Sequence, residues 1–324
     1  MKLSHSRAVL LMLVVTLLWS VAGVVSRHLQ AAQSFEVTFW RSAACAVTMA
    51  VVLAWQRGGV VALGRSVRVG GALMWWSGLC WAVMFTAFMM ALTLTTVANV
   101  LITMALGPLF TALIARVVLG QRLALRTWCA IVVAGLGIGW MFGSQLLAEP
   151  PPGALAGAAV TASWVGTLVS LTVPIGGATM WALAQHNAAR HAEQRADLML
   201  AVLIGALLSA AATLPLAWPM AATPRDLVLL SGLGVVQLAI PCLLAVSAGK
   251  VLKAPEAALL GLLEILFGVT WTWLGTTESP TPAVLGGGAL VIGALAANEG
   301  WALWGARGSN AGRDAQPDPG VTIT

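Results

Sequence analysis

The chain has 324 residues, of which 59% are apolar and 9% charged, and its formal net charge is +6. So little charge excludes a soluble globular domain, and the apolar runs reach the roughly 20 residues with which a helix crosses about 30 Å of hydrocarbon. Because the basic residues lie between these runs, the positive charge indicates loops that face an anionic membrane leaflet, and no nucleic-acid partner is expected.

Ten apolar runs follow one another along the chain. They cover residues 8–26, 36–56, 69–91, 94–115, 127–146, 165–187, 198–218, 226–248, 255–275 and 283–303. The first run can also be read as a cleavable signal peptide, because Lys2 and Arg7 precede it and small residues end it. Cleavage would spoil the charge alternation of all later loops, so we expect the first span to be retained.

Fourteen of the seventeen Lys and Arg residues fall into every second gap between these runs. They are Lys2 and Arg7; Arg57, Arg65 and Arg68; Arg116, Arg122 and Arg126; Arg190 and Arg195; Lys250 and Lys253; and Arg307 and Arg313. The other gaps hold only Arg27 and Arg225, and Arg41 lies within a span. Since short loops rich in Lys and Arg stay in the cytoplasm, the pattern predicts ten transmembrane helices with both termini cytoplasmic.

The runs divide into two halves of five, joined by the Pro- and Gly-rich stretch 149–156. A shift of 157 residues lays Leu109 over Leu266 and Phe110 over Phe267. An odd number of spans in each half forces the halves into opposite orientations, and inverted repeats of this kind recur in transporters. We therefore expect an all-α transmembrane fold of ten helices in two inverted five-helix repeats. The expected units are the repeats 8–147 and 165–303 and a disordered cytoplasmic tail, 304–324.

Glycines cluster in the last span of each half. Gly135, Gly137 and Gly139 lie in the fifth span, and residues 286–288 are all glycine in the tenth. Small residues allow helix backbones to approach closely in lipid, so we expect helix packing there. A contact between two copies of the chain is the alternative, and the sequence is compatible with a monomer or a homodimer.

Two charged residues lie inside predicted spans, where a charge costs at least about 2.5–3.5 kcal/mol on insertion scales. Arg41 lies roughly 8 Å into the second span. It either binds a carboxylate of the solute or is an ion-paired structural residue. Glu264 lies roughly 14 Å into the ninth span, close to the midplane, where desolvation disfavours its charge. It is our candidate proton-coupling residue, and the alternative is a carboxyl group that satisfies polar groups of the bundle.

Five further residues belong to the expected solute site. Asn99 in the fourth span can bind either a solute or a neighbouring helix. Pro108 and Pro241 each remove one hydrogen bond from a span, which a helix lining a cavity tolerates. Trp19 and Ser20 lie within the first span, where the indole either shapes a pocket for an apolar or aromatic solute or fills the core.

Catalytic and cofactor motifs are absent from the sequence. It contains no GxxxxGK[ST] phosphate loop, no HExxH and no GxSxG. The four histidines are scattered, and the four cysteines lie singly within spans, so no metal site is expected. We therefore expect neither an enzyme nor a bound cofactor or metal.

Three segments carry a family resemblance: TLLWSVAGVVSR at 16–27, FWR at 39–41 and GPLFTALIARVVLGQRL at 107–123. With them the chain resembles the EamA-type drug/metabolite transporter superfamily over nearly all residues up to about 303. The resemblance implies a ten-helix carrier of two inverted repeats in a bacterial inner membrane, in a family that often exports amino acids or other metabolites. Two positions depart from the family pattern. Gln121 replaces an acidic residue after the fourth span, and Ile265 replaces a ninth-span proline.

We therefore expect a secondary transporter that exports a small amphipathic metabolite, such as an amino acid, by alternating access. Either proton exchange or the solute gradient itself would drive transport, so the expected partners are the solute, the lipid bilayer and, in the first case, protons. An efflux carrier for cationic drugs, with Glu264 binding the cation, is the alternative within transport. A receptor or an assembly subunit that transports nothing is the alternative outside it.

Overall fold

The computed structural model describes residues 4–119, 125–147, 156–188, 190, 196–252, 260–261, 263–277 and 280–314. Among these residues the regular structure is helical throughout, and no strand occurs. Gln121, which stands where the family pattern has an acidic residue, lies outside the described residues, and so does the tail beyond residue 314.

The first half of the chain forms helices α1 to α8. Their bounds are α1 (His5–Trp19), α2 (Val21–Ser26), α3 (Ser34–Arg57), α4 (Val60–Val69), α5 (Ala72–Leu94), α6 (Val97–Met104), α7 (Gly107–Leu119) and α8 (Leu125–Leu147). The short helix α4 lies in the basic loop after the second span, and the other helices occupy the first five apolar runs.

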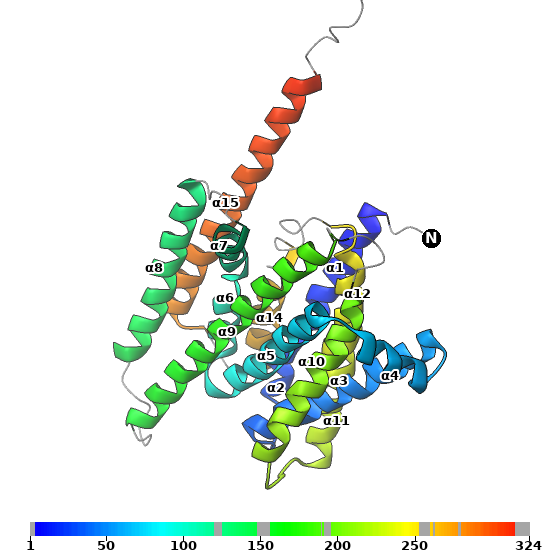
Figure 1. Cartoon of the computed structure of the whole chain (residues 1–324). Helices are drawn as coiled ribbons and strands as arrows, with labels where there is room; N and C mark the ends of the chain where they lie inside the picture. Colours follow the sequence, from blue (N-terminus) through cyan, green and yellow to red (C-terminus); the bar gives the residue numbers. More distant parts are fainter. Residues whose placement is uncertain are drawn as a thin grey trace, which may run out of the picture.

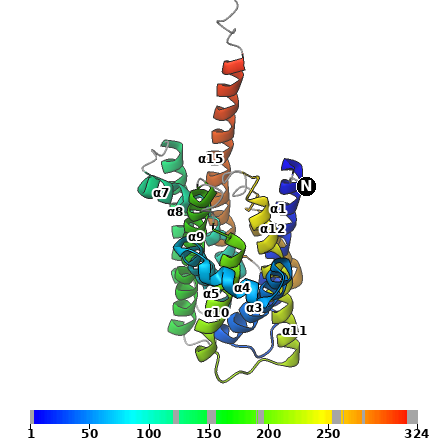
Figure 2. The same ribbon diagram turned by 45° about the vertical axis from the view of Figure 1, so that its right-hand side comes forward.

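The second half begins with the long helix α9 and ends with α15. Its elements are α9 (Ala156–Ala188), α10 (Leu198–Thr213), the 3-10 turn η2 (Leu214–Leu216), α11 (Pro224–Gly232), the π-helix η3 (Leu233–Ala239), α12 (Ile240–Ala248), α14 (Leu263–Gly275) and α15 (Pro282–Asp314). In both views the N-terminal end of α1 and the C-terminal end of α15 point to the upper end of the molecule, and α11 lies at the lower end (Figures 1 and 2).

Every predicted apolar run contains a helix among the described residues. In the part of the chain that the structure describes, seven helical segments are long and apolar enough to cross a membrane: His5–Ser26, Ser34–Arg57, Ala72–Leu94, Val97–Ile114, Trp164–Ala184, Leu198–Leu216 and Pro224–Ala248. Shorter apolar stretches lie at Trp128–Gly137 and Pro282–Ala294. The all-α, multi-pass membrane class is therefore confirmed, whereas the count of ten spans stays a prediction.

The structure differs from the sequence prediction at the C-terminal tail. Helix α15 continues to Asp314, well into the segment 304–324 that was expected to be disordered. No proline occurs between Pro282 and Pro317, and a glycine costs only about 1 kcal/mol in a helix. Nothing in this part of the sequence therefore stops the helix that begins at Pro282.

Two spans are irregular beside a proline. The fourth span is broken at Ala105 and Leu106, between α6 and α7, and Pro108 has no N–H to donate to Met104 O. In the eighth span the π-helix η3 ends just before Pro241. A proline ring crowds the carbonyl of the residue four positions earlier, and a wider π turn relieves this contact.

The contacts between helices come in matched sets when each helix is compared with its counterpart, the helix at the same place in the other half. Helix α5, in the third span, packs against α9 in the sixth span and α10 in the seventh. The counterparts of these three helices lie in the eighth, first and second spans. There α12 contacts α1, and α11 and η3 contact α3. Three contacts join a helix to its own counterpart: α3 with α10, α6 with α14, and α8 with α15. The two halves are therefore interleaved across one shared interface.

The glycines of the fifth and tenth spans lie where α8 and α15 run side by side (Figure 1). A Cβ atom at Gly137 would lie 2.7 Å from Gly287 O, which is closer than real Cβ atoms approach a backbone. The predicted close helix packing is thus present at this position, within a single chain.

Candidate functional site

A cavity of about 150 Å³ lies where the broken fourth span meets α14. Its walls come from α1, α5, the α6–α7 break, α9 and the residues around the start of α14. An engineered protein cavity of this size holds a benzene ring, so this central cavity suits one small ring or branched side chain. Its lining is largely apolar, and Glu264 is the only ionisable residue among the described residues that line it.

The two halves contribute matching residues to the central cavity. Three of the residues around the α6–α7 break that line it have counterparts, 157 positions later, that line it too. The pairs are Met104 and Gly261, Gly107 and Glu264, and Pro108 and Ile265. This offset is the one that aligns the predicted repeats, so the cavity lies where counterpart helices of the two halves meet.

Glu264 lies in the first turn of α14 and is 9% exposed. Among the described residues, none forms a hydrogen bond or ion pair with its carboxyl group. An ionised carboxylate without partners in an apolar cavity is poorly solvated, so its charge depends on what else occupies the cavity. A proton or a cationic group of a solute can each neutralise it.

Trp19 and Ser20 lie at the junction of α1 and α2, but only Trp19 lines the central cavity. Ser20 is 2% exposed; its hydroxyl donates to Leu17 O at 2.7 Å and accepts from Trp271 Nε1 at 3.2 Å. Ser20 therefore links the first span to α14, the helix that carries Glu264.

Arg41 is 1% exposed and does not line the central cavity. Its Nη1 donates to Gln237 Oε1 and its Nη2 to Phe85 O, both at 3.0 Å, and the guanidinium lies over the Phe88 ring. The Gln237 amide in turn donates to Trp19 O at 3.3 Å. Within the described part of the chain Arg41 has only neutral partners. Through Gln237 it is linked to the backbone carbonyl of Trp19.

Asn99 and Pro241 also lie away from the central cavity. Asn99 is 2% exposed, and its amide donates at 3.0 Å to Oγ1 of Thr95, which lies in the short link between α5 and α6. Its Oδ1 accepts no hydrogen bond from the described residues. Pro241 is buried in α12. Of the predicted site residues, the structure therefore brings Trp19, Pro108 and Glu264 into one cavity.

Sequence reasoning missed several lining residues. Trp181 and Pro174 of α9 and the methionines Met12, Met84 and Met104 all contribute to the wall. Tryptophan and methionine occur throughout apolar spans, so no pattern separates those at a cavity from those in the core. Pro174 interrupts a span, which was the one sequence feature that pointed to it.

Comparison with known proteins supports the fold and the family. A solved structure described as "Crystal structure of protein" is similar over 90% of this chain and 97% of its own, with a TM-score of 0.55 and 18% identity. At that identity the likeness shows a shared fold only. No curated protein gives a significant match. The model of the EamA-like transporter family matches residues 6–143, so the predicted resemblance to this family is confirmed over that part of the chain.

Proposed function

We propose that the chain is a secondary transporter that exports a small amphipathic metabolite, such as an amino acid, by alternating access. The observation that carries the proposal is a central cavity lined by three pairs of residues 157 positions apart. A site between two related bundles can face one side of the membrane and then the other as the bundles rock. The family match of residues 6–143 supports a membrane transporter in general.

The proposed architecture is two inverted five-helix repeats, 8–147 and 165–303, in a bacterial inner membrane. The matched helix contacts support the repeats. The alternation of basic loops supports cytoplasmic termini. Under this orientation the upper end of the bundle in Figure 1 is the cytoplasmic end.

Glu264 is the proposed coupling residue. When ionised, its carboxylate binds an ammonium group of the solute in the central cavity, and a proton replaces the solute after release. Because the same carboxylate cannot hold both, export of one solute is exchanged for uptake of one proton. Trp19 and Pro108 line the same cavity and would shape the site around the apolar part of the solute.

A second candidate function, efflux of cationic drugs, is favoured by one observation. The ionisable residue at the central cavity is acidic, and Arg41 binds Gln237 and Phe85 O instead of facing the cavity. A cationic solute needs this acid alone, whereas a solute with a carboxylate needs a cationic partner elsewhere in the protein.

Solute flux in sealed liposomes tests both candidates. Liposomes with the purified full-length chain are loaded with labelled L-phenylalanine, L-leucine, tetraphenylphosphonium or glucose, and efflux is followed under a proton gradient. Efflux of the amino acids above that of protein-free liposomes is the expected result. Efflux of tetraphenylphosphonium alone establishes the second candidate, and no efflux of any solute by folded protein contradicts transport of these classes.

A further inference from the structure

A second, larger cavity of about 610 Å³ lies near the upper end of the bundle, between α5, α9, α10 and α12. We call it the vestibule. Trp181 of α9 lines both the vestibule and the central cavity, so its indole stands between them. Trp81, which is 4% exposed, forms a second aromatic wall of the vestibule.

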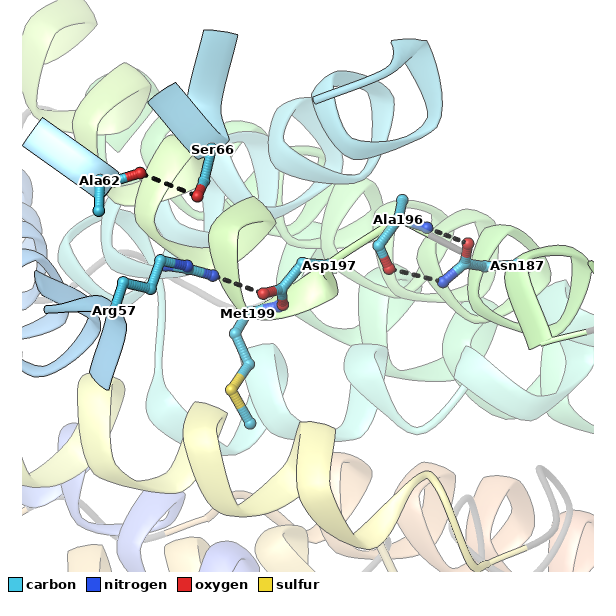
Figure 3. A network of polar contacts seen from close by, with 7 residues as sticks. All are labelled: Arg57, Ala62, Ser66, Asn187, Ala196, Asp197 and Met199. Atoms are coloured by element: carbon cyan, nitrogen blue, oxygen red, sulfur yellow. Dashed lines mark hydrogen bonds and ion pairs between the residues drawn. The ribbon is translucent and has the colours of Figure 1, made fainter. Parts of the chain in front are cut away.

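The charged residues at the vestibule do not balance one another. Asp197 accepts a hydrogen bond from Met199 N at 2.9 Å and forms an ion pair with Arg57, so its negative charge is already neutralised (Figure 3). Lys250 lines the same cavity and has no acidic partner among the described residues. The described part of the vestibule wall therefore has a net positive charge at Lys250.

The polar side chains on the rim are held by their own contacts. Asn187 donates to Ala196 O at 2.9 Å and accepts from Ala196 N at 2.8 Å, which fixes its amide (Figure 3). Asn187 and Asp197 thus have partners, and of the charged lining residues that the structure describes, Lys250 is the one without an acidic partner.

We propose that the vestibule is a second solute site, at which Lys250 binds a carboxylate and Trp81 and Trp181 contact an apolar or aromatic body. This inference rests on the proposed transport function and narrows its solute to small amphipathic molecules with a carboxylate. An ammonium group on the same molecule then meets Glu264 in the central cavity. The two opposite charges thus lie on either side of Trp181, which matches a zwitterion better than a simple cation.

Trp181, the lining residue that the two cavities share, packs beside a glycine of the vestibule. A Cβ atom at Gly249 would lie 3.4 Å from Trp181 Cζ3 and 3.6 Å from Cη2, so the indole edge rests against this glycine. Gly249 itself lines the vestibule.

Calorimetric binding to the purified full-length protein in detergent tests the carboxylate site. The probes are L-phenylalanine, 3-phenylpropionate, which lacks the ammonium group, and L-phenylalaninamide, which lacks the carboxylate. Lys250→Met should weaken binding of the first two about five- to tenfold and leave the amide unchanged, since only a charge-assisted hydrogen bond is lost. Lys250→Arg should bind both carboxylates nearly as well as the wild type.

Arg65→Met is the matched control, because it removes a positive charge from α4 without touching the vestibule. Equal weakening by Lys250→Met and Arg65→Met overturns the site, as does failure of both carboxylates to bind the wild type at millimolar concentration. Binding that depends on Lys250 without flux in liposomes refutes transport and leaves the site standing. Flux that is the same in the wild type and in Lys250→Met supports transport and refutes the solute site at Lys250.

Discussion

Glu36 and Asp226 each bind the loop that leads into the other's helix. Glu36, in the first turn of α3, accepts hydrogen bonds at 2.9 Å from the backbone N–H groups of residues 221 and 222, which precede α11. Asp226, in the first turn of α11, accepts from the N–H groups of residues 30–32, which precede α3, at 2.8 to 3.3 Å. Both side chains are fully buried. We call this reciprocal arrangement the carboxylate brace.

The carboxylate brace ties the first half of the chain to the second at the lower end of the bundle (Figure 1). Hydrogen bonds to an ionised carboxylate are roughly twice as strong as neutral ones, so the two loops separate only when several of them break together. The vestibule lies towards the opposite end.

Glu36→Gln should loosen the lower end. In the wild type the N–H groups of residues 221 and 222 donate to two carboxylate oxygens. Glutamine offers one acceptor oxygen, and its NH₂ group would face an N–H donor. We therefore expect the free energy of unfolding, measured by thermal unfolding, to fall by about 1.5–3 kcal/mol. Hydrogen–deuterium exchange should become faster in residues 27–33 and 217–223. Gln33→Ala, which removes a neighbouring side chain outside the brace, is the control. Unchanged exchange in both loops of Glu36→Gln would show that the brace does not hold this end closed.

Reporter fusions test the proposed orientation. Fusions after residues 60, 122, 192, 252 and 310 should report the cytoplasm, and fusions near 31, 93, 150, 223 and 280 the outside. The reason is that twelve of the seventeen basic residues lie in the first set of segments and two more in the N-terminal segment. Activity of a cytoplasmic reporter and an external reporter, measured at each position, assigns the side. If fusions at 31 and 192 report the same side, the ten-span arrangement is wrong.

Local features of the sequence predicted much of the fold. Run length alone predicted membrane helices, because the bilayer sets the length of a spanning helix. The depth of Glu264 in its run predicted a buried carboxyl, and the structure places it at the central cavity. Pro108 predicted an irregular fourth span because a proline cannot donate the helical hydrogen bond, and the span is broken beside it.

The partners of the buried polar groups were beyond sequence reasoning because they are distant in the chain and chemically neutral. Arg41 binds Gln237, 196 residues away, and a backbone carbonyl 44 residues away. An arginine in a span suggests an acidic partner, and neither of these acceptors is an acid. The carboxylate brace likewise joins side chains to backbone N–H groups 185 or more residues away, which no local pattern encodes.

Glu264→Gln should abolish the pH dependence of flux while the protein remains folded. In the proposed exchange, a lower pH outside speeds export by the wild type, because protons then replace the solute more often at the carboxylate. Glutamine has nearly the same shape and cannot ionise, so its flux should not vary with outer pH. Glu264→Asp should keep the dependence, and Thr111→Val, which alters another lining residue, serves as the control. A pH response in Glu264→Gln equal to that of the wild type assigns Glu264 a structural role.

Arg41→Lys should destabilise the protein nearly as much as Arg41→Ala. The two Nη atoms donate to acceptors on separate elements, Gln237 and Phe85 O, and a single ammonium group cannot reach both in the same way. Each lost bond to a charged donor costs about 1.5–3 kcal/mol, to be read from thermal unfolding in detergent. Wild-type stability in Arg41→Lys would mean that a point charge suffices. Reduced solute affinity at unchanged stability would instead support direct solute binding by Arg41.

Trp181→Ala should connect the vestibule to the central cavity, because the indole is the side chain that lines both. The measurement is the rate at which a cationic methanethiosulfonate reagent labels Ala178→Cys, a buried position in the wall of the central cavity. Cys80 and Cys129 are replaced by alanine beforehand, whereas Cys45 and Cys242 are buried and can stay. We expect labelling to be slow with Trp181 present and severalfold faster in Trp181→Ala, with Trp181→Phe in between. Removal of a tryptophan also costs packing energy, so Trp75→Ala, at a residue that is 46% exposed on α5, is the matched control. Equal labelling rates with and without the indole, in protein that unfolds cooperatively, would rule out Trp181 as the barrier between the two cavities.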